Sequence, residues 1–185
     1  MTVVSGLPRS GTSLMMQALE AGGIPVLIDN IRKSDEDNPK GYYEYEPVKK
    51  TETDSTWVEN AVGKAVKMVY RLLYDLPKKY EYRVIFMRRK MDEVLASQRI
   101  ILNRTEQIDT YPRDEKLADF FNRDLEKVYL WLENQENFSM VLINYNKIVK
   151  SPLTECRRVD EFLGIGLDVD KMASVVNPSL YRNRL

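Results

Sequence analysis

The sequence predicts an α/β fold in three layers, with a central parallel sheet of about four to five strands flanked by helices. Short apolar runs typical of buried strands alternate along the chain with amphipathic helical stretches. Between the first strand and the first helix lies a loop with the glycine spacing of a phosphate-binding loop, a motif that requires this strand–loop–helix context. Both observations favour parallel strands joined by helical crossovers, with helices on both faces of the sheet.

Four strands and four helices are expected from the apolar pattern. The strands are predicted over residues 2–6, 65–69, 83–88 and 140–143. The helices are predicted over residues 11–21, 92–103, 114–137 and 152–163. Glycines are expected to end the first and the last of these helices, because glycine favours the backbone that terminates a helix. The polar, turn-rich residues 29–47 are expected to form a long functional loop.

The bulk composition limits the kind of protein. With 185 residues, of which 43% are hydrophobic and 30% charged, the chain is expected to fold as one domain over residues 1–185. Its 28 basic and 28 acidic residues give zero net charge, so no nucleic-acid partner is expected. A single cysteine, Cys156, builds neither a disulfide framework nor a zinc cluster. The lone cysteine favours a reducing, cytoplasmic compartment. No membrane span or signal peptide is evident.

The absence of histidine narrows the chemistry further. Histidine is the most common general base and metal ligand, so catalytic triads and histidine–metal sites are excluded. Any general base must be Asp, Glu, Lys, Tyr or a water molecule.

Residues 6–13, Gly-Leu-Pro-Arg-Ser-Gly-Thr-Ser, form the glycine loop. The spacing is that of G-x-x-x-x-G-K-[ST] and predicts a P-loop NTPase-like fold, but Thr12 stands where the lysine that grips β- and γ-phosphates belongs. Backbone N–H groups, the helix dipole and the hydroxyls of Thr12 and Ser13 favour an anion. The planar fork of Arg9 suits phosphate or sulfate oxygens. The loop is therefore expected to bind a phosphate ester, not ATP with magnesium.

The segment Pro8-Arg9-Ser10-Gly11-Thr12-Ser13 resembles the phosphate loop of the sulfotransferase family, Pro-[Lys/Arg]-Ser-Gly-Thr-[Thr/Ser]. The chain as a whole resembles a small bacterial-type member of that family. The resemblance implies that the co-substrate is 3′-phosphoadenosine 5′-phosphosulfate (PAPS), with 3′-phosphoadenosine 5′-phosphate as product and no metal required. It also implies that these six residues bind the 5′-phosphate, and that Arg9 stabilises the bridging oxygen as the sulfuryl group leaves.

A second match follows the third predicted strand. The family has an arginine at a strand end and a serine eight residues later, and both bind the 3′-phosphate. Arg89 and Ser97 have this spacing, and Arg88 is a neighbour that can share the task. The resemblance departs at Lys90-Met91, where the family often has Asn-Pro or Asp-Pro. Read from the residues alone, a strand-end arginine and a serine in the first turns of the next helix can converge on one anion at the carboxyl ends of the strands.

A third and weaker match lies near the end of the chain. The stretch from Leu142 to Val149, together with Phe162-Leu163-Gly164, is similar to the late strand of the family and to the helix that follows it. We interpret this stretch as architecture and not as chemistry.

A carboxylate is the natural candidate for the base that activates the acceptor. Some carbohydrate-type sulfotransferases carry Asn-Pro-x-Gly followed by two aromatic residues and Glu, and residues 38–44 resemble that pattern. The resemblance implies that Glu44 is the base. Glu46 is the second candidate, because alternation in an extended segment puts it on the same side as Glu44. Both are also compatible with solvated loop acids.

Three further basic residues are candidates for the site. Lys67, on the second predicted strand, can approach the sulfuryl oxygens as a second cation, or face solvent at the strand end. Arg182 and Arg184 lie in a basic C-terminal segment. Family members often bring such a segment to the 3′-phosphate, so the resemblance implies a role for both in co-substrate binding.

The sequence leaves three functions open. The first is sulfuryl transfer from PAPS to a hydroxyl or amine of a small-molecule or glycan acceptor. The second is a P-loop kinase or nucleotide hydrolase, against which the missing loop lysine counts. The third is a non-catalytic member that only binds nucleotide. Neither the acceptor nor the oligomeric state can be read from the residues.

Overall fold

The computed structural model of the chain describes residues 1–33, 41–104 and 114–177. Its centre is a parallel sheet of four strands in the order β2-β1-β3-β4. The strands are β1 (Thr2–Gly6), β2 (Ala65–Lys67), β3 (Tyr82–Arg88) and β4 (Phe138–Asn144). The predicted α/β fold with a parallel sheet is therefore confirmed.

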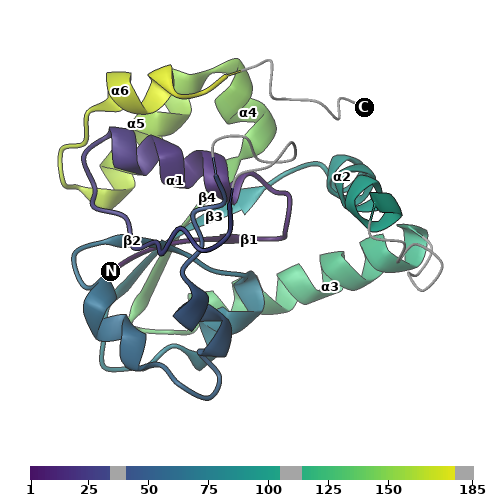
Figure 1. Ribbon diagram of the computed structural model, residues 1–185, viewed down its shortest axis with the longest axis horizontal. Helices are drawn as coiled ribbons and strands as arrows, with labels where there is room; N and C mark the ends of the chain where they lie inside the picture. The colour runs from purple at the N-terminus through teal and green to yellow at the C-terminus, as the bar shows by residue number, and fades with distance from the viewer. Residues whose placement is uncertain (34–40, 105–113, 178–185) are drawn as a thin grey trace.

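The two faces of the sheet are covered by different helices, which gives three layers (Figure 1). Side chains alternate along each strand, so Val3 and Val4 of β1 pack into different hydrophobic clusters. The cluster around Val4 includes residues of the helices α1 (Thr12–Ala21), α4 (Tyr145–Lys150), α5 (Pro152–Leu163) and α6 (Val169–Ser174).

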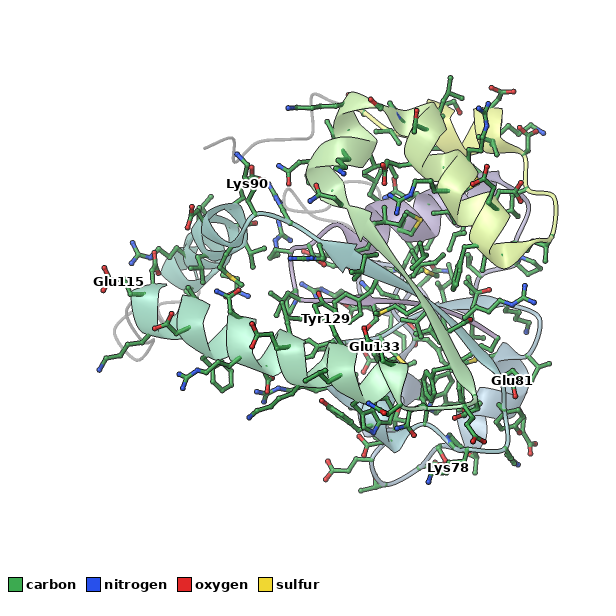
Figure 2. All side chains as sticks on the ribbon, turned by 180° about the vertical axis from the view of Figure 1, so that it is seen from behind. Lys78, Glu81, Lys90, Glu115, Tyr129 and Glu133 are labelled. Atoms are coloured by element: carbon green, nitrogen blue, oxygen red, sulfur yellow. The ribbon has the colours of Figure 1, made fainter. Side chains whose placement is uncertain are left out.

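The opposite face carries different elements. The cluster around Val3 includes residues of α2 (Met91–Arg104) and α3 (Asp114–Glu133) and of three 3-10 helices, η1 (Glu46–Lys50), η2 (Thr56–Ala61) and η3 (Tyr70–Asp75). On this face Tyr129 of α3 contacts the ring of Phe86 in β3, with the ring centroids 5.0 Å apart. Figure 2 shows Tyr129 on the side of α3 that is turned toward the sheet.

Most predicted elements are present, and their ends differ for local reasons. The strand predicted over residues 65–69 ends at Lys67, because Val69 already caps η3. The helix predicted over residues 114–137 ends at Glu133. Residues 134–137 turn instead toward β4, where Asn137 donates its side-chain N–H to the Tyr80 carbonyl. Helices α4 and α6 and the three 3-10 helices were not predicted, because each spans only five or six residues.

The candidate site residues lie near the carboxyl ends of the strands, and the strand order explains why. From β1 the chain proceeds through α1 to β2 on one side, whereas β3 lies on the other side of β1. The segments that follow β1 and β3 therefore diverge to opposite faces of the sheet. In open α/β sheets, ligands bind outside the carboxyl ends of the strands at such a point. In the part of the chain that the structure describes, no helix is long and apolar enough to cross a membrane.

Candidate functional site

The glycine loop predicted to bind phosphate, residues 6–13, joins β1 to α1 and requires glycine at two positions. Gly6 has φ 147°, and a Cβ atom there would lie 2.6 Å from the carbonyl oxygen of Met87. Gly11 has φ 99°, and its Cβ would lie 2.4 Å from Cδ2 of Tyr145. A side chain at either position would collide with a neighbouring strand or ring. Arg9, between them, also adopts a left-handed backbone with φ 71°, which is uncommon for a residue other than glycine.

The loop ends at the N-terminus of α1, where an anion would be stabilised. The first hydrogen bond of the helix runs from the N–H of Met15 to the carbonyl of Gly11. The N–H groups of the preceding turn and the helix dipole therefore favour negative charge at this end. Ser10 is buried, and its Oγ has no hydrogen-bond partner among the described residues. Because a buried hydroxyl usually has a partner, the orphan Oγ fits a loop that accepts a polar ligand.

Three of the predicted co-substrate residues come together beside this loop. The Arg9 Nε atom donates to Ser97 Oγ at 2.8 Å, and Arg89 Nη1 donates to the carbonyl oxygen of Arg9 at 3.2 Å. The predicted pair that follows β3 therefore contacts the loop that follows β1.

The two arginines at the end of β3 face different surroundings. The side chain of Arg89 is only 8% exposed and pairs with Glu93, with 2.8 Å between Nε and Oε2. Arg88 is exposed, and its guanidinium carbon lies 5.9 Å from the ring centre of Tyr129. Lys90, labelled with Tyr129 in Figure 2, is also exposed. Arg89 contacts the loop at the carbonyl oxygen of Arg9.

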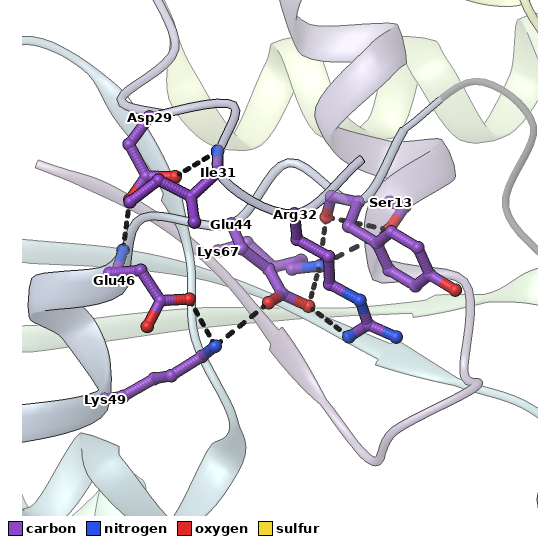
Figure 3. Close-up of polar contacts among 9 residues, drawn as sticks. Ser13, Asp29, Ile31, Arg32, Glu44, Glu46, Lys49 and Lys67 are labelled. Atoms are coloured by element: carbon purple, nitrogen blue, oxygen red, sulfur yellow. Dashed lines mark hydrogen bonds and ion pairs between the residues drawn. The ribbon is translucent and has the colours of Figure 1, made fainter. Parts of the chain in front are cut away.

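Glu44 lies at the centre of a second cluster, beside the end of β2 (Figure 3). Its carboxylate pairs with Arg32 at 2.9 Å, with Lys49 at 3.3 Å and with Lys67 at 3.7 Å. Burial alone would raise the pKa of the Glu44 carboxyl. The positive charges of Lys67, Arg32 and Lys49 outweigh this effect and lower the pKa, so Glu44 is ionised at neutral pH.

Lys67 connects the Glu44 cluster to the start of α1. Its ammonium group contacts the carbonyl oxygen of Tyr42 and lies 3.4 Å from Ser13 Oγ, which itself donates to the Tyr42 carbonyl at 3.2 Å. Burial is the main cause that lowers the pKa of Lys67 to about 8, although the charge of Glu44 opposes the shift. Lys67 therefore does not face solvent at the strand end, and it lies between Glu44 and the loop.

Glu46 occupies the outer side of this cluster. Its Oε1 lies 2.5 Å from Lys49 Nζ, so Glu44 and Glu46 share one lysine. Its backbone N–H donates to the carboxylate of Asp29, and this bond joins the two ends of the predicted loop (Figure 3). The same carboxylate also accepts the N–H of Ile31. The side chain of Glu46 is 40% exposed, compared with 16% for Glu44.

Several contact residues were not predicted. Arg32 and Lys49 pair with Glu44, and their sequence neighbourhood carried no signal beyond being polar. Tyr145 packs on Gly11, and Asn146 binds Glu93 at 2.9 Å. The signal in the sequence is the position of this pair directly after a strand, because ligands bind at the carboxyl ends of the strands in α/β folds.

The remaining predicted residues differ in exposure, or lie outside the described part of the chain. Pro8 is exposed and Thr12 is half-buried at the mouth of the loop. Arg182, Arg184 and residues 38–40 lie outside the described residues. Within residues 1–33, 41–104 and 114–177, no three Cys, Asp or Glu side chains gather as a metal site would require.

Comparisons with known proteins agree with the fold. No family model and no curated protein matches this chain. Among solved structures, it is similar to the sulfotransferase domain from the curacin biosynthetic pathway. The TM-score is 0.58 at 12% sequence identity, with 100% of this chain and 91% of the other covered. The chain has the fold of a sulfotransferase domain. At this identity the likeness establishes the sulfotransferase fold and leaves the co-substrate and the acceptor to be proposed.

Substituting Gly11 tests the shape of this sulfotransferase-like loop. Gly11→Ala places a Cβ against the ring of Tyr145 and forces alanine into a left-handed backbone. Gly63→Ala is the matched control, since Gly63 also has positive φ (76°) but open space around it. We expect Gly63→Ala to cost about 1–2 kcal/mol of unfolding free energy and Gly11→Ala clearly more. Urea unfolding of both variants measures the difference, and equal losses would contradict the close contact with Tyr145.

Lys67 should give the protein a measurable pH dependence of stability. In the unfolded chain its pKa returns toward the ordinary 10.5, so between pH 8 and 10.5 the unfolded state holds more protons than the folded state. The free energy of unfolding should therefore rise with pH in this window, by at most about 1.4 kcal/mol per pH unit from this group. Lys67→Met should remove that contribution. Urea unfolding from pH 7.5 to 10 for both proteins tests this, and parallel curves would show that Lys67 is not perturbed.

Proposed function

We propose that this protein transfers a sulfuryl group from PAPS to a hydroxyl or amine of a small-molecule or glycan acceptor. The observation that carries the proposal is a glycine loop that lacks the lysine of nucleoside-triphosphate sites and has contacts on both sides. Arg9 forms a hydrogen bond to Ser97 on one side, and Lys67 approaches Ser13 on the other. Such a loop offers a cradle for a phosphate ester and omits the lysine that nucleoside triphosphates require. The sulfotransferase fold supports the same chemistry.

The loop residues are assigned to the two phosphates of the co-substrate. Residues 8–13 would hold the 5′-phosphate, with backbone N–H groups and the helix dipole as the main attraction. Ser97 and Arg89, together with Arg182 and Arg184, would hold the 3′-phosphate. The structure supports the first pair by its contact with the loop, and the C-terminal arginines rest on the resemblance alone.

The transfer itself requires charge stabilisation and a proton acceptor. The acceptor oxygen or nitrogen forms a bond to sulfur while the bond between sulfur and the bridging phosphate oxygen breaks. Arg9 would stabilise the charge that develops on that oxygen, and Lys67 the charge on the sulfuryl oxygens. The acceptor proton would pass to Glu44, which is already ionised, with Glu46 as the second candidate. No metal is assigned to any of these steps.

A non-catalytic, nucleotide-binding protein is the alternative that one observation favours. Three cations surround Glu44 and lower its pKa, and a carboxylate with a low pKa is a weak base. On this reading the cluster would stabilise the loop of residues 41–46 and no transfer would follow nucleotide binding.

The setting in the cell is also a proposal. Cys156, the one cysteine of the chain, is a buried free thiol in α5, and burial raises its pKa to about 11. A chain with one cysteine and therefore no disulfide framework is typical of a reducing compartment, and we propose the cytoplasm for this reason.

Nucleotide binding is the first prediction of this function. A thermal-shift titration with 3′-phosphoadenosine 5′-phosphate at about 100 times its Kd should stabilise the protein by about 2.7 kcal/mol, or roughly 5–11 °C in Tm. Mg-ATP should give little shift. Arg9→Ala should abolish most of the effect, whereas Arg88→Ala, which removes the neighbouring arginine that faces Tyr129, should retain it. A shift with Mg-ATP alone would point instead to a kinase or nucleotide hydrolase.

The base assignment makes a separate prediction about turnover. Glu44→Gln removes the proton acceptor but keeps the size of the side chain, so we expect kcat to fall at least about tenfold with nucleotide binding retained. Glu46→Gln should lower kcat less. Glu59→Gln, at an exposed residue that pairs with Lys79 at 3.4 Å, should leave kcat unchanged. Transfer of labelled sulfate to a panel of acceptors measures this. If neither Glu44 nor Glu46 affects kcat, the base is another group; if wild type binds the nucleotide without transfer, the non-catalytic alternative holds.

A further inference from the structure

A buried carboxylate lies where the strand-end arginine meets the phosphate loop. Glu93, in the first turn of α2, is fully buried. Its Oε2 accepts a hydrogen bond from Arg89 Nε at 2.8 Å, and its Oε1 accepts one from Asn146 Nδ2 at 2.9 Å. Both oxygens are therefore used in fixed directions. The proposed function gives no role to Glu93 or Asn146.

The arginine that Glu93 holds contacts the loop in two ways. Arg89 Nη1 donates to the carbonyl oxygen of Arg9 at 3.2 Å. The Arg89 guanidinium carbon also lies 4.5 Å from the ring centre of Tyr145, and that ring fills the space beside Gly11. Arg89 therefore contacts the middle of the loop directly and its end through Tyr145.

The backbone of the loop needs such support. Arg9 has φ 71°, a conformation that persists in a non-glycine residue only where the surroundings maintain it. A hydrogen bond to its carbonyl oxygen from a buried, oriented guanidinium is one such constraint. The same backbone directs the Arg9 side chain to Ser97, so the orientation of Arg89 also affects where the Arg9 guanidinium lies.

Asn146 is itself placed by the end of β4. The side chain of Asn144 accepts the backbone N–H groups of Asn146 and Lys147, at 2.9 and 3.2 Å, and so caps α4. This cap fixes the first turn of α4 and with it the side chain that reaches Glu93. The residues that support the loop therefore come from three places: Glu93 from α2, Arg89 from the end of β3, and Asn146 from the junction between β4 and α4.

We propose that Glu93 and Asn146 are positioning residues, which hold the guanidinium of Arg89 against the Arg9 carbonyl and so maintain the shape of the phosphate loop. The effect on the loop is independent of the nucleotide. The consequence for binding of 3′-phosphoadenosine 5′-phosphate rests on the proposed function.

A role for Arg89 as a phosphate ligand alone, without any part in maintaining the loop, predicts the opposite effect on binding. If Arg89 acted only as a cation for the nucleotide, the negative charge of Glu93 would compete with the phosphate. Removing that charge would then tighten binding. If Glu93 positions Arg89, removing the charge leaves a buried cation poorly held, and binding should weaken.

Three variants and one control separate these effects. Glu93→Gln keeps the shape and removes the charge, and Asn146→Asp places a second carboxylate against Glu93. In the double variant Glu93→Gln/Asn146→Asp, the new amide can accept from Arg89 and donate to the new carboxylate, so the network is complete again. Glu155→Gln is the control, because Glu155 is another buried glutamate that pairs with an arginine, Arg158, at 2.6 Å in a different part of the fold.

The readouts are amide hydrogen exchange of peptides that cover residues 6–14, compared with peptides from β3 and β4, and the Kd for 3′-phosphoadenosine 5′-phosphate. We expect each single variant to accelerate exchange in the loop about tenfold more than in the strands and to raise the Kd about tenfold. The double variant should return both the loop exchange rate and the Kd most of the way to their wild-type values. Glu155→Gln should lower Tm without a selective effect on the loop.

The outcomes are distinct. Loop exchange equal to wild type in Glu93→Gln, or no faster than in the strands, would overturn the positioning role. Tighter nucleotide binding in Glu93→Gln, or no recovery in the double variant, would also overturn it. If wild type does not bind the nucleotide, the proposed function fails, and loop exchange still decides the role of Glu93.

Discussion

The close approach of β1 to the end of β3 is the constraint on which the site depends. Gly6 pairs with Met87 in the parallel register, and the carbonyl of Met87 occupies the space that a side chain at position 6 would need. Only because Gly6 has no Cβ can the chain turn there and run along the end of β3. That turn brings Arg9 to Ser97 and Arg89. The contact of two strands, which is part of the fold, thus sets the geometry of the loop to which the proposed function assigns the 5′-phosphate.

The charges around the loop are balanced in two groups on different elements. Arg89 is paired with Glu93 beyond the end of β3, and Lys67 with Glu44 beyond the end of β2. Burying such pairs contributes little net stability, because the loss of hydration offsets most of the attraction. Their value lies in orientation, since each carboxylate fixes the direction in which its cation points. An anion at the start of α1 would have one such cation on either side of it.

The fold was largely predictable from the sequence, and the site only in part. Buried parallel strands and long amphipathic helices leave a strong periodic signal, so β1, β3, β4, α1 and α3 were located to within a few residues. The spacing of the glycine loop likewise located Arg9, and the pairing of Arg89 with Ser97 led to two residues that contact the loop. Short elements carry too few residues for a period to show. The partners of Glu44 could not be foreseen, because Arg32, Lys49 and Lys67 approach it from three separate segments.

The ion pairs of Glu44 bear on what kind of base it would be. Three cations lower its pKa and so weaken it as a proton acceptor. Sulfuryl transfer, like phosphoryl transfer, depends mainly on positioning and on stabilising charge, and little covalent work is left to the protein. The cations that weaken Glu44 also fix its carboxylate beside Lys67, which contacts the start of α1. In the proposed transfer Glu44 would therefore contribute more through its fixed position than through its basicity.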